Sequence, residues 1–175
     1  MIARFAALAA ALLLASAPAA APAADNAIND AQIAHIAYTA GQLDVEAARQ
    51  ALQRSRNAEV RAFAETMLRD HQAVNEQALA LLQRLHVTPE PHATSAALTG
   101  QAEQERQRLA ALDGAAFDRA YAEREAAYHA AVNDALRGTL IPAAHNAELK
   151  ALLEQGLALF GAHQEHAEAL ARQLR

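Results

Sequence analysis

The chain has 175 residues, a formal net charge of −5 and a hydrophobic fraction of 53%, much of it alanine. The absence of cysteine excludes disulfide bonds, thiolate metal sites and thiol catalysis. A mildly acidic chain without lysine and arginine clusters is not expected to bind nucleic acid. Because alanine favours helix and β-branched residues are scarce, we expect an all-α protein.

Residues 1–24 are typical of a secretory signal peptide. A positive start precedes an apolar run over residues 5–15, which is too short to span a bilayer as a helix. Small residues and prolines follow, and we expect cleavage near Ala23 or Ala24. An uncleaved membrane anchor is the alternative, but the length and the flanking residues fit it poorly. The mature chain, residues 25–175, is then one exported domain without a membrane-spanning segment, in the periplasm or peripheral to the outer membrane.

Two long helices are predicted in the first half of the mature chain by apolar residues that recur at steps of three and four. The first spans about residues 28–55 and the second about residues 58–85. The short stretch between them offers Ser55 or Asn57 as an N-cap for the second helix. A connection this short makes the two helices an antiparallel hairpin.

The middle of the chain predicts a long connection with one further helix. Two prolines and several small polar residues indicate a linker over about residues 86–99. A polar segment over about residues 96–112 has few apolar anchors, so we expect a shorter, outer helix that ends before Gly114. The next long helix covers about residues 116–137, and we expect Gly138 to end it.

The last long helix begins after Pro142 and Asn146 and continues to the C-terminus. Four long amphipathic helices, two tight hairpins and one long middle connection favour a particular fold class. We expect a ferritin-like antiparallel four-helix bundle with a short extra helix in the connection between the second and third long helices.

Several ionisable residues fall on the apolar faces of these helices, where burial requires a partner or a metal ion. At about 100° per residue, Asp44 lies near the centre of the first apolar face and His71 near the centre of the second. Carboxylates and imidazoles that enter one core from several helices are typical of metal sites. The candidate ligands of a transition metal (iron, copper, zinc or manganese) are Asp44, Asp70, His71, Glu125, His129, His163 and His166.

The same residues can instead form a metal-free polar layer that fixes the register of the helices. In that interpretation Asp44 accepts a hydrogen bond from His71 or His163. The residues that would complete the network are Asn75, Tyr121 and Tyr128. Nucleophilic catalysis has almost no support, because the serines and threonines lack a glycine elbow or an oxyanion loop around them, so an enzyme here would need a metal ion.

The run Met67, Asp70, His71 and Asn75 resembles an exported bacterial family catalogued as domain of unknown function 4142 and often labelled predicted outer-membrane protein. Further matching residues are Asp44, Val45, Phe117, Asp118, Tyr121, His129, His163, Ala167 and Leu170. The resemblance covers about residues 28–174. It implies a ferritin-like helical bundle in the periplasm or at the outer membrane, without a settled activity.

Two residues depart from the pattern of that family. Asp44 stands where a glutamate is common, which weakens a strict ferritin-type ligand set. Ala158 stands where the last helix often has proline, which predicts a straighter helix, since proline would kink it.

We therefore expect a cell-envelope protein, non-catalytic or weakly catalytic, whose inward cluster of histidines and carboxylates binds a transition metal. One alternative is a structural or stress-related interaction module in which the same residues form a buried polar layer. A weaker alternative is a ferroxidase-like enzyme. The expected partners are another envelope protein or a second copy of the chain.

Overall fold

The computed structural model describes residues 28–175, and the regular structure in this range is entirely helical. The predicted all-α class is therefore confirmed. The expected signal peptide, residues 1–24, lies outside the described residues. Within residues 28–175, none of the helices combines the length and the apolar character that crossing a membrane requires.

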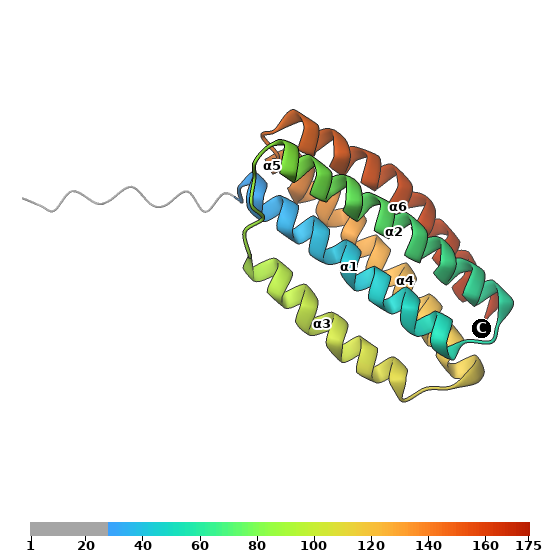
Figure 1. The fold of residues 1–175 in the computed structure, drawn as a ribbon. Helices are drawn as coiled ribbons and strands as arrows, with labels where there is room; N and C mark the ends of the chain where they lie inside the picture. Colours follow the sequence, from blue (N-terminus) through green and yellow to red (C-terminus); the bar gives the residue numbers. More distant parts are fainter. Residues whose placement is uncertain (1–27) are drawn as a thin grey trace, which may run out of the picture.

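Helices α1 (Asp30–Arg54) and α2 (Ala58–Arg84) form the first antiparallel hairpin (Figure 1). Asn29 caps α1, because its side chain accepts from the backbone N–H of Gln32 while the Gln32 side chain accepts from that of Asn29. Asn57 caps α2 by accepting from two backbone N–H groups of the first turn. The expected hairpin and its cap at Asn57 are confirmed.

The connection between α2 and the next long helix contains α3 (Ala93–Ala110), which begins earlier than predicted. The expected linker over residues 86–99 is wrong in its second half. The reason is a capping box: the His92 side chain accepts from the backbone N–H of Thr94, while Ser95 Oγ accepts from that of His92. These hydrogen bonds cap the N-terminus of α3, so the helix begins two residues after Pro91.

The second hairpin consists of α4 (Gly114–Ala135) and α6 (Ala147–Gln173). Asn146 caps α6 as predicted, by accepting from the backbone N–H groups of Glu148 and Leu149. The helix continues without interruption through Ala158.

The expectation that Gly138 ends the third long helix is wrong. The backbone stays helical through a π-helical turn, Leu136–Leu140, and a last turn, α5 (Ile141–Ala143). One glycine costs a helix only about 1 kcal/mol relative to alanine, which does not outweigh the burial of Leu136 and Leu140 against the core.

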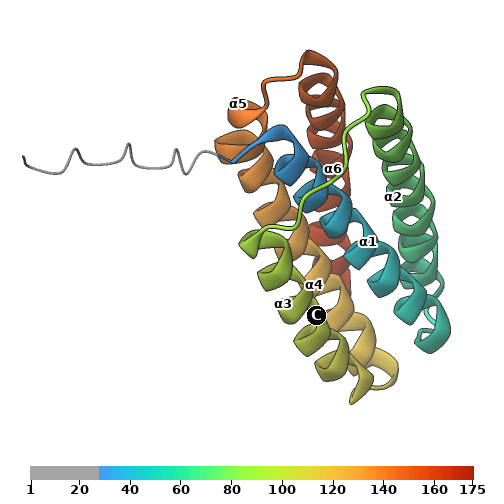
Figure 2. The same cartoon turned by 60° about the vertical axis from the view of Figure 1, so that its left-hand side comes forward.

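The two hairpins pack face to face, α1 against α4 and α2 against α6, and α3 lies on the outer side of α1 (Figures 1 and 2). Because the connection through α3 travels the length of the bundle, α2 and α4 point in the same direction. This arrangement brings side chains from two distant halves of the chain into one interior.

The interior contains two apolar clusters with polar residues between them. One cluster, with Phe63, Met67 and Phe117, fills the end near the turn between α1 and α2. The other, with Ile33 and Leu82, fills the opposite end. Five buried ionisable residues stand between the residues of the two clusters along their helices: Asp44 on α1, His71 on α2, Glu125 and His129 on α4, and His163 on α6.

Candidate metal centre

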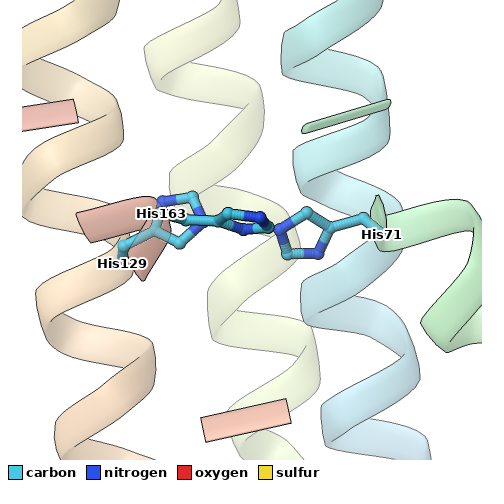
Figure 3. A group of neighbouring side chains, drawn as sticks. All are labelled: His71, His129 and His163. Atoms are coloured by element: carbon cyan, nitrogen blue, oxygen red, sulfur yellow. The ribbon is translucent and has the colours of Figure 1, made fainter. Parts of the chain in front are cut away.

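Three histidines meet in the middle of the bundle, one each from α2, α4 and α6 (Figure 3). One ring nitrogen each of His71, His129 and His163 lies within 4.8 Å of the others. The two Nε2 atoms of His71 and His129 are 3.4 Å apart. All three residues are at most 4% exposed. Each is held there because it lies on the apolar stripe of its helix, among residues that pack into the core.

Two carboxylates lie beside these rings. Oδ2 of Asp44, on α1, is 3.1 Å from Nε2 of His71. Oε2 of Glu125 is 3.6 Å from Nδ1 of His129, one helical turn further along α4. Asp44, Glu125 and His129 form a second group of three mutually close donor atoms, and both carboxylates are fully buried. All four long helices therefore contribute to one cluster.

Hydrogen bonds decide which ring nitrogens are free. Nδ1 of His129 donates to the backbone carbonyl of Glu125 at 3.0 Å, so Nε2 keeps its lone pair. Nε2 of His163 lies 3.1 Å from Oδ2 of Asp70, a carboxylate that accepts the N–H, which leaves the lone pair on Nδ1. That Nδ1 is buried and has no hydrogen-bond partner among residues 28–175. Two of the three rings are thus oriented by a group outside the cluster.

Burial keeps the three imidazoles neutral. It lowers the pKa of His71 to about 4, against the attraction of Asp44, and the neighbouring His129 and His163 lower it further. Burial also lowers the pKa of His129 and that of His163. At neutral pH all three rings are therefore in the unprotonated form that binds metal ions.

The pKa values of the two buried carboxyl groups shift in opposite directions. Burial would raise the pKa of Asp44, but His71, His129 and Arg124 together lower it below its usual value. Burial raises the pKa of Glu125 well above its usual value, and the nearby Asp44 charge adds to this effect although Arg124 opposes it. The negative charge of the pair is therefore favoured on Asp44 over Glu125.

Arg124 compensates these carboxylates and is not among the site residues predicted from the sequence. Its Nη1 donates to Oδ1 of Asp44 at 3.1 Å and also to Oε1 of Glu125, and the guanidinium lies 4.2 Å from the centre of the Tyr128 ring. The sequence pattern does place Arg124 on the inward face of its helix. At about 100° per residue, Arg124 lies within about 20° of Phe117 and 40° of Tyr128 on the apolar face of α4.

Asn133 was also missed, although it lies one turn after His129. It is fully buried, and its Nδ2 donates to the Phe160 carbonyl and to Oε1 of Gln164, which fastens α4 to α6 beside the cluster. At about 100° per residue, Asn133 lies about 160° from Phe117, so the angular test would not have found it.

Two of the predicted ligands lie apart from the cluster. Asp70 is partly buried at its edge and contacts it only through His163, while its other carboxylate oxygen accepts from Arg69. His166 is exposed, and its ring packs on the edge of Phe63 at a centroid distance of 5.0 Å. The remaining five candidates, Asp44, His71, Glu125, His129 and His163, are the ones that the fold brings together.

The three residues expected in a polar layer lie around the cluster without joining it. Tyr128 donates its hydroxyl to the Ala40 carbonyl at 2.8 Å. Asn75 and Tyr121 are buried, and neither Nδ2 of Asn75 nor the Tyr121 hydroxyl has a hydrogen-bond partner within the described part of the chain. The continuous network that the metal-free interpretation requires is therefore interrupted at two of its three added members.

The fold and the cluster define an all-α bundle with a buried set of histidines and carboxylates in the middle of its core. The chain belongs to the family described as domain of unknown function (DUF4142), whose model matches residues 15–170. This confirms the family that the residues around His71 resemble. Comparison with curated proteins and with solved structures finds no match.

Proposed function

We propose that this protein binds one transition-metal ion through His71, His129, His163 and Asp44. The observation that carries the proposal is the spacing of donor atoms: 3.4 Å between the Nε2 atoms of His71 and His129, and 3.1 Å from Nε2 of His71 to Oδ2 of Asp44. Two ligand atoms that each lie about 2.0–2.1 Å from a tetrahedral ion are about 3.3–3.4 Å apart. The side chains therefore approach the spacing of a coordination shell.

The donor set restricts the class of metal. Neutral imidazoles with one carboxylate suit zinc, iron, copper and manganese better than calcium or magnesium, which prefer oxygen ligands. Arg124 already compensates Asp44 and Glu125, so a second ion between these carboxylates would meet a fixed positive charge. We therefore propose a site for one ion and not a two-metal centre.

We further propose that the arrangement of the helices is ferritin-like. Three features agree with that fold: the two hairpins, the long connection through α3, and a cluster to which every long helix contributes a side chain. Fold resemblance by itself carries no activity, so the function rests on the cluster.

The first test is metal binding by metal-depleted protein. Calorimetric titration with Zn²⁺, Cu²⁺, Fe²⁺ and Mn²⁺, together with elemental analysis, should give one ion per chain for at least one of these metals. His71→Ala should abolish tight binding, because it removes a ligand from the centre of the cluster. His166→Ala is the matched control and should bind as the wild type does, since this ring is exposed. Absence of binding in the wild type contradicts the proposal.

A second test concerns Asp70, which we propose as a positioning residue and not a ligand. Asp70→Ala removes the acceptor that orients His163, and loss of such a partner typically weakens metal affinity by about 10–100-fold. The stoichiometry should stay at one ion. The control is Asp134→Ala, which removes an exposed carboxylate whose ion pair within residues 28–175 is with Arg137. An unchanged affinity in Asp70→Ala would show that this contact does not orient the ligand.

The pairing of Arg124 with both carboxylates favours a second candidate function, a metal-free polar layer in a structural or interaction module. Under that alternative, His71→Ala lowers the melting temperature, but metal ions change the melting temperature of neither protein. Under the metal proposal, the ion stabilises only the wild type, by mass action.

We also propose that the protein is exported to the periplasm or to the periphery of the outer membrane. The support is the sequence of residues 1–24, with its positive start and short apolar core. The mass of the protein recovered from the expressing bacterium should correspond to a chain that begins near Ala24, in the periplasmic fraction. An intact N-terminus in the cytoplasmic fraction would refute the proposal.

A further inference from the structure

A cavity of about 850 Å³ adjoins the histidine cluster. It begins beside His71 and His129 and extends between the helices to the underside of α3, which lies outside α1 (Figure 2). Its volume is in the range of about 300–1,000 Å³ that is usual for small-molecule sites. The cavity therefore has the size of a ligand site and not of a packing defect.

Most of the cavity wall is hydrocarbon. Representative side chains come from α1, α2, α3, α4, the π-helical turn and α6: Ile36, Leu82, Leu98, Val132, Leu140 and Leu153. Apolar walls of this extent favour an occupant that is itself mainly apolar, because both surfaces leave water on binding.

One part of the wall is polar and unsatisfied. Asn75, which lines the cavity, is 5% exposed, and its Nδ2 has no hydrogen-bond partner in residues 28–175. His71 also lines the cavity, and its Nδ1 is without a partner in the same range. A buried amide N–H without an acceptor costs about 1–3 kcal/mol, so a ligand oxygen at this point would be favoured. Asn75 is thus the polar contact that would orient an occupant.

The charges near the cavity indicate that the occupant is neutral. Arg124, the buried cation on the wall, already pairs with Asp44 and Glu125. At the outer end, Glu105 pairs with Arg108. Glu123, the remaining acidic residue of the wall, is exposed to solvent. A carboxylate or an ammonium group deep in the apolar interior would therefore have no unpaired countercharge beside it and would be costly to desolvate.

Helix α3 covers the outer end of the cavity. It is held at its start by Ser95, whose Oγ lies 2.9 Å from Nδ1 of His35, and near its end by Gln50, which donates to the Arg106 carbonyl at 2.9 Å. Between these anchors, Leu98 and Ala102 face the cavity. The middle of α3 therefore forms part of the cavity wall.

We propose that this cavity binds a neutral, mainly hydrocarbon molecule with one hydrogen-bond acceptor, such as a ketone, ester or ether oxygen, which accepts from Nδ2 of Asn75. The inference does not depend on the metal site. It is tested on metal-depleted protein, so that its failure and the failure of the metal proposal are distinguishable.

The experiment uses N-phenyl-1-naphthylamine as a fluorescent probe and butyrophenone, butylbenzene and 4-phenylbutyrate as competitors. The wild type should bind the probe saturably, and both neutral competitors should displace it, whereas the carboxylate should not. Asn75→Leu should weaken butyrophenone about fivefold to tenfold and leave butylbenzene unchanged or tighter, because only the ketone loses a hydrogen bond. Failure of the wild type to bind the probe saturably, or an equal effect of Asn75→Leu on both neutral competitors, overturns the proposal.

A second variant locates the site. Ala37→Phe places a large side chain on the cavity wall and should reduce probe binding at least tenfold. Ala80→Phe makes the same substitution at an exposed position of α2 away from the cavity and should bind the probe as the wild type does. Helical content measured by circular dichroism should be equal in all variants. Undiminished binding by folded Ala37→Phe protein would place the probe elsewhere and overturn the proposal.

Discussion

At the scale of single residues, Arg124 determines how much charge the centre of the bundle holds. Two carboxylates buried within reach of each other repel strongly in an apolar interior. The guanidinium of Arg124 contacts both Asp44 and Glu125, and burial together with the Asp44 charge raises the pKa of Glu125. The carboxylate nearest to His71 is that of Asp44, whose Oδ2 lies 3.1 Å from Nε2 of the ring.

Gly41 is a second residue whose identity is set by a close contact. A Cβ atom at this position would lie 2.3 Å from Oδ1 of Asn75. Only glycine lets α1 approach the Asn75 side chain closely enough to hold it beside the cavity.

We predict that Gly41→Ala destabilises the protein, although alanine is normally the better helix former by about 1 kcal/mol. The matched control is Gly100→Ala on α3, where a Cβ meets nothing within 4 Å, and this variant should gain up to about 1 kcal/mol. Urea unfolding of both variants measures the difference. Equal stabilisation in the two would mean that Asn75 moves aside without cost.

At the scale of elements, α3 is attached to the bundle by fewer buried residues than any of the four long helices. Its buried residues are Ser95 and Leu109, whereas each of the four long helices buries a full stripe. Polar contacts at its two ends supply much of its attachment, including the bond from Arg54 to the Leu112 carbonyl at 2.7 Å. Segments with few buried apolar contacts open at lower free energy than the core.

We predict that Ser95→Ala loosens α3 without unfolding the four long helices. It removes one half of the capping box and the contact with His35, and loss of an N-terminal cap costs about 1 kcal/mol. Hydrogen exchange should become about fivefold faster in α3 and stay the same in α2 and α6. Thr94→Ala is the control, because its exposed side chain hydrogen-bonds to the adjacent cap His92 and makes no hydrogen bond to α1. Uniform acceleration along the whole chain would contradict this independence of α3.

At the scale of the whole molecule, the stability of the metal-free protein should depend on pH. Burial lowers the pKa of His71 from 6.5 to about 4 in the fold, and it also lowers that of His129 and His163. Between about pH 6.5 and 4 the unfolded chain therefore binds a proton on His71 that the folded protein does not bind, and the lowered pKa values of His129 and His163 act in the same direction. Glu125 acts in the opposite direction, because its pKa is raised in the fold, but it is one group against three.

We therefore predict that the free energy of unfolding falls as the pH is lowered from 7 to 5, and that it falls further below pH 4, where Asp44 must be protonated. Urea unfolding of metal-depleted protein at pH 7, 6 and 5 measures this. A saturating metal ion should steepen the loss, since protons compete for the same nitrogens. Stability that rises on acidification would mean that the Glu125 contribution dominates.

Much of the fold could be predicted from the sequence because its signals are local. Apolar residues at steps of three and four, together with the cap at Asn57 and the cap at Asn146, define where most of the helices run. The angle of a residue about its own helix is also a local property. That is why Asp44, His71 and His163 could be assigned to inward faces, and why Arg124 could have been.

Only the tertiary structure decided which inward residues meet. Packing between residues far apart in the chain sets how far one helix is shifted along its neighbour and how it is rotated against it. A local sequence pattern holds no information about either quantity. Packing brings His163 to the cluster and leaves His166, less than one turn away, in solvent. It also encloses the cavity beside Asn75 and inserts Arg124 between two carboxylates, because both require helices from separate hairpins to converge.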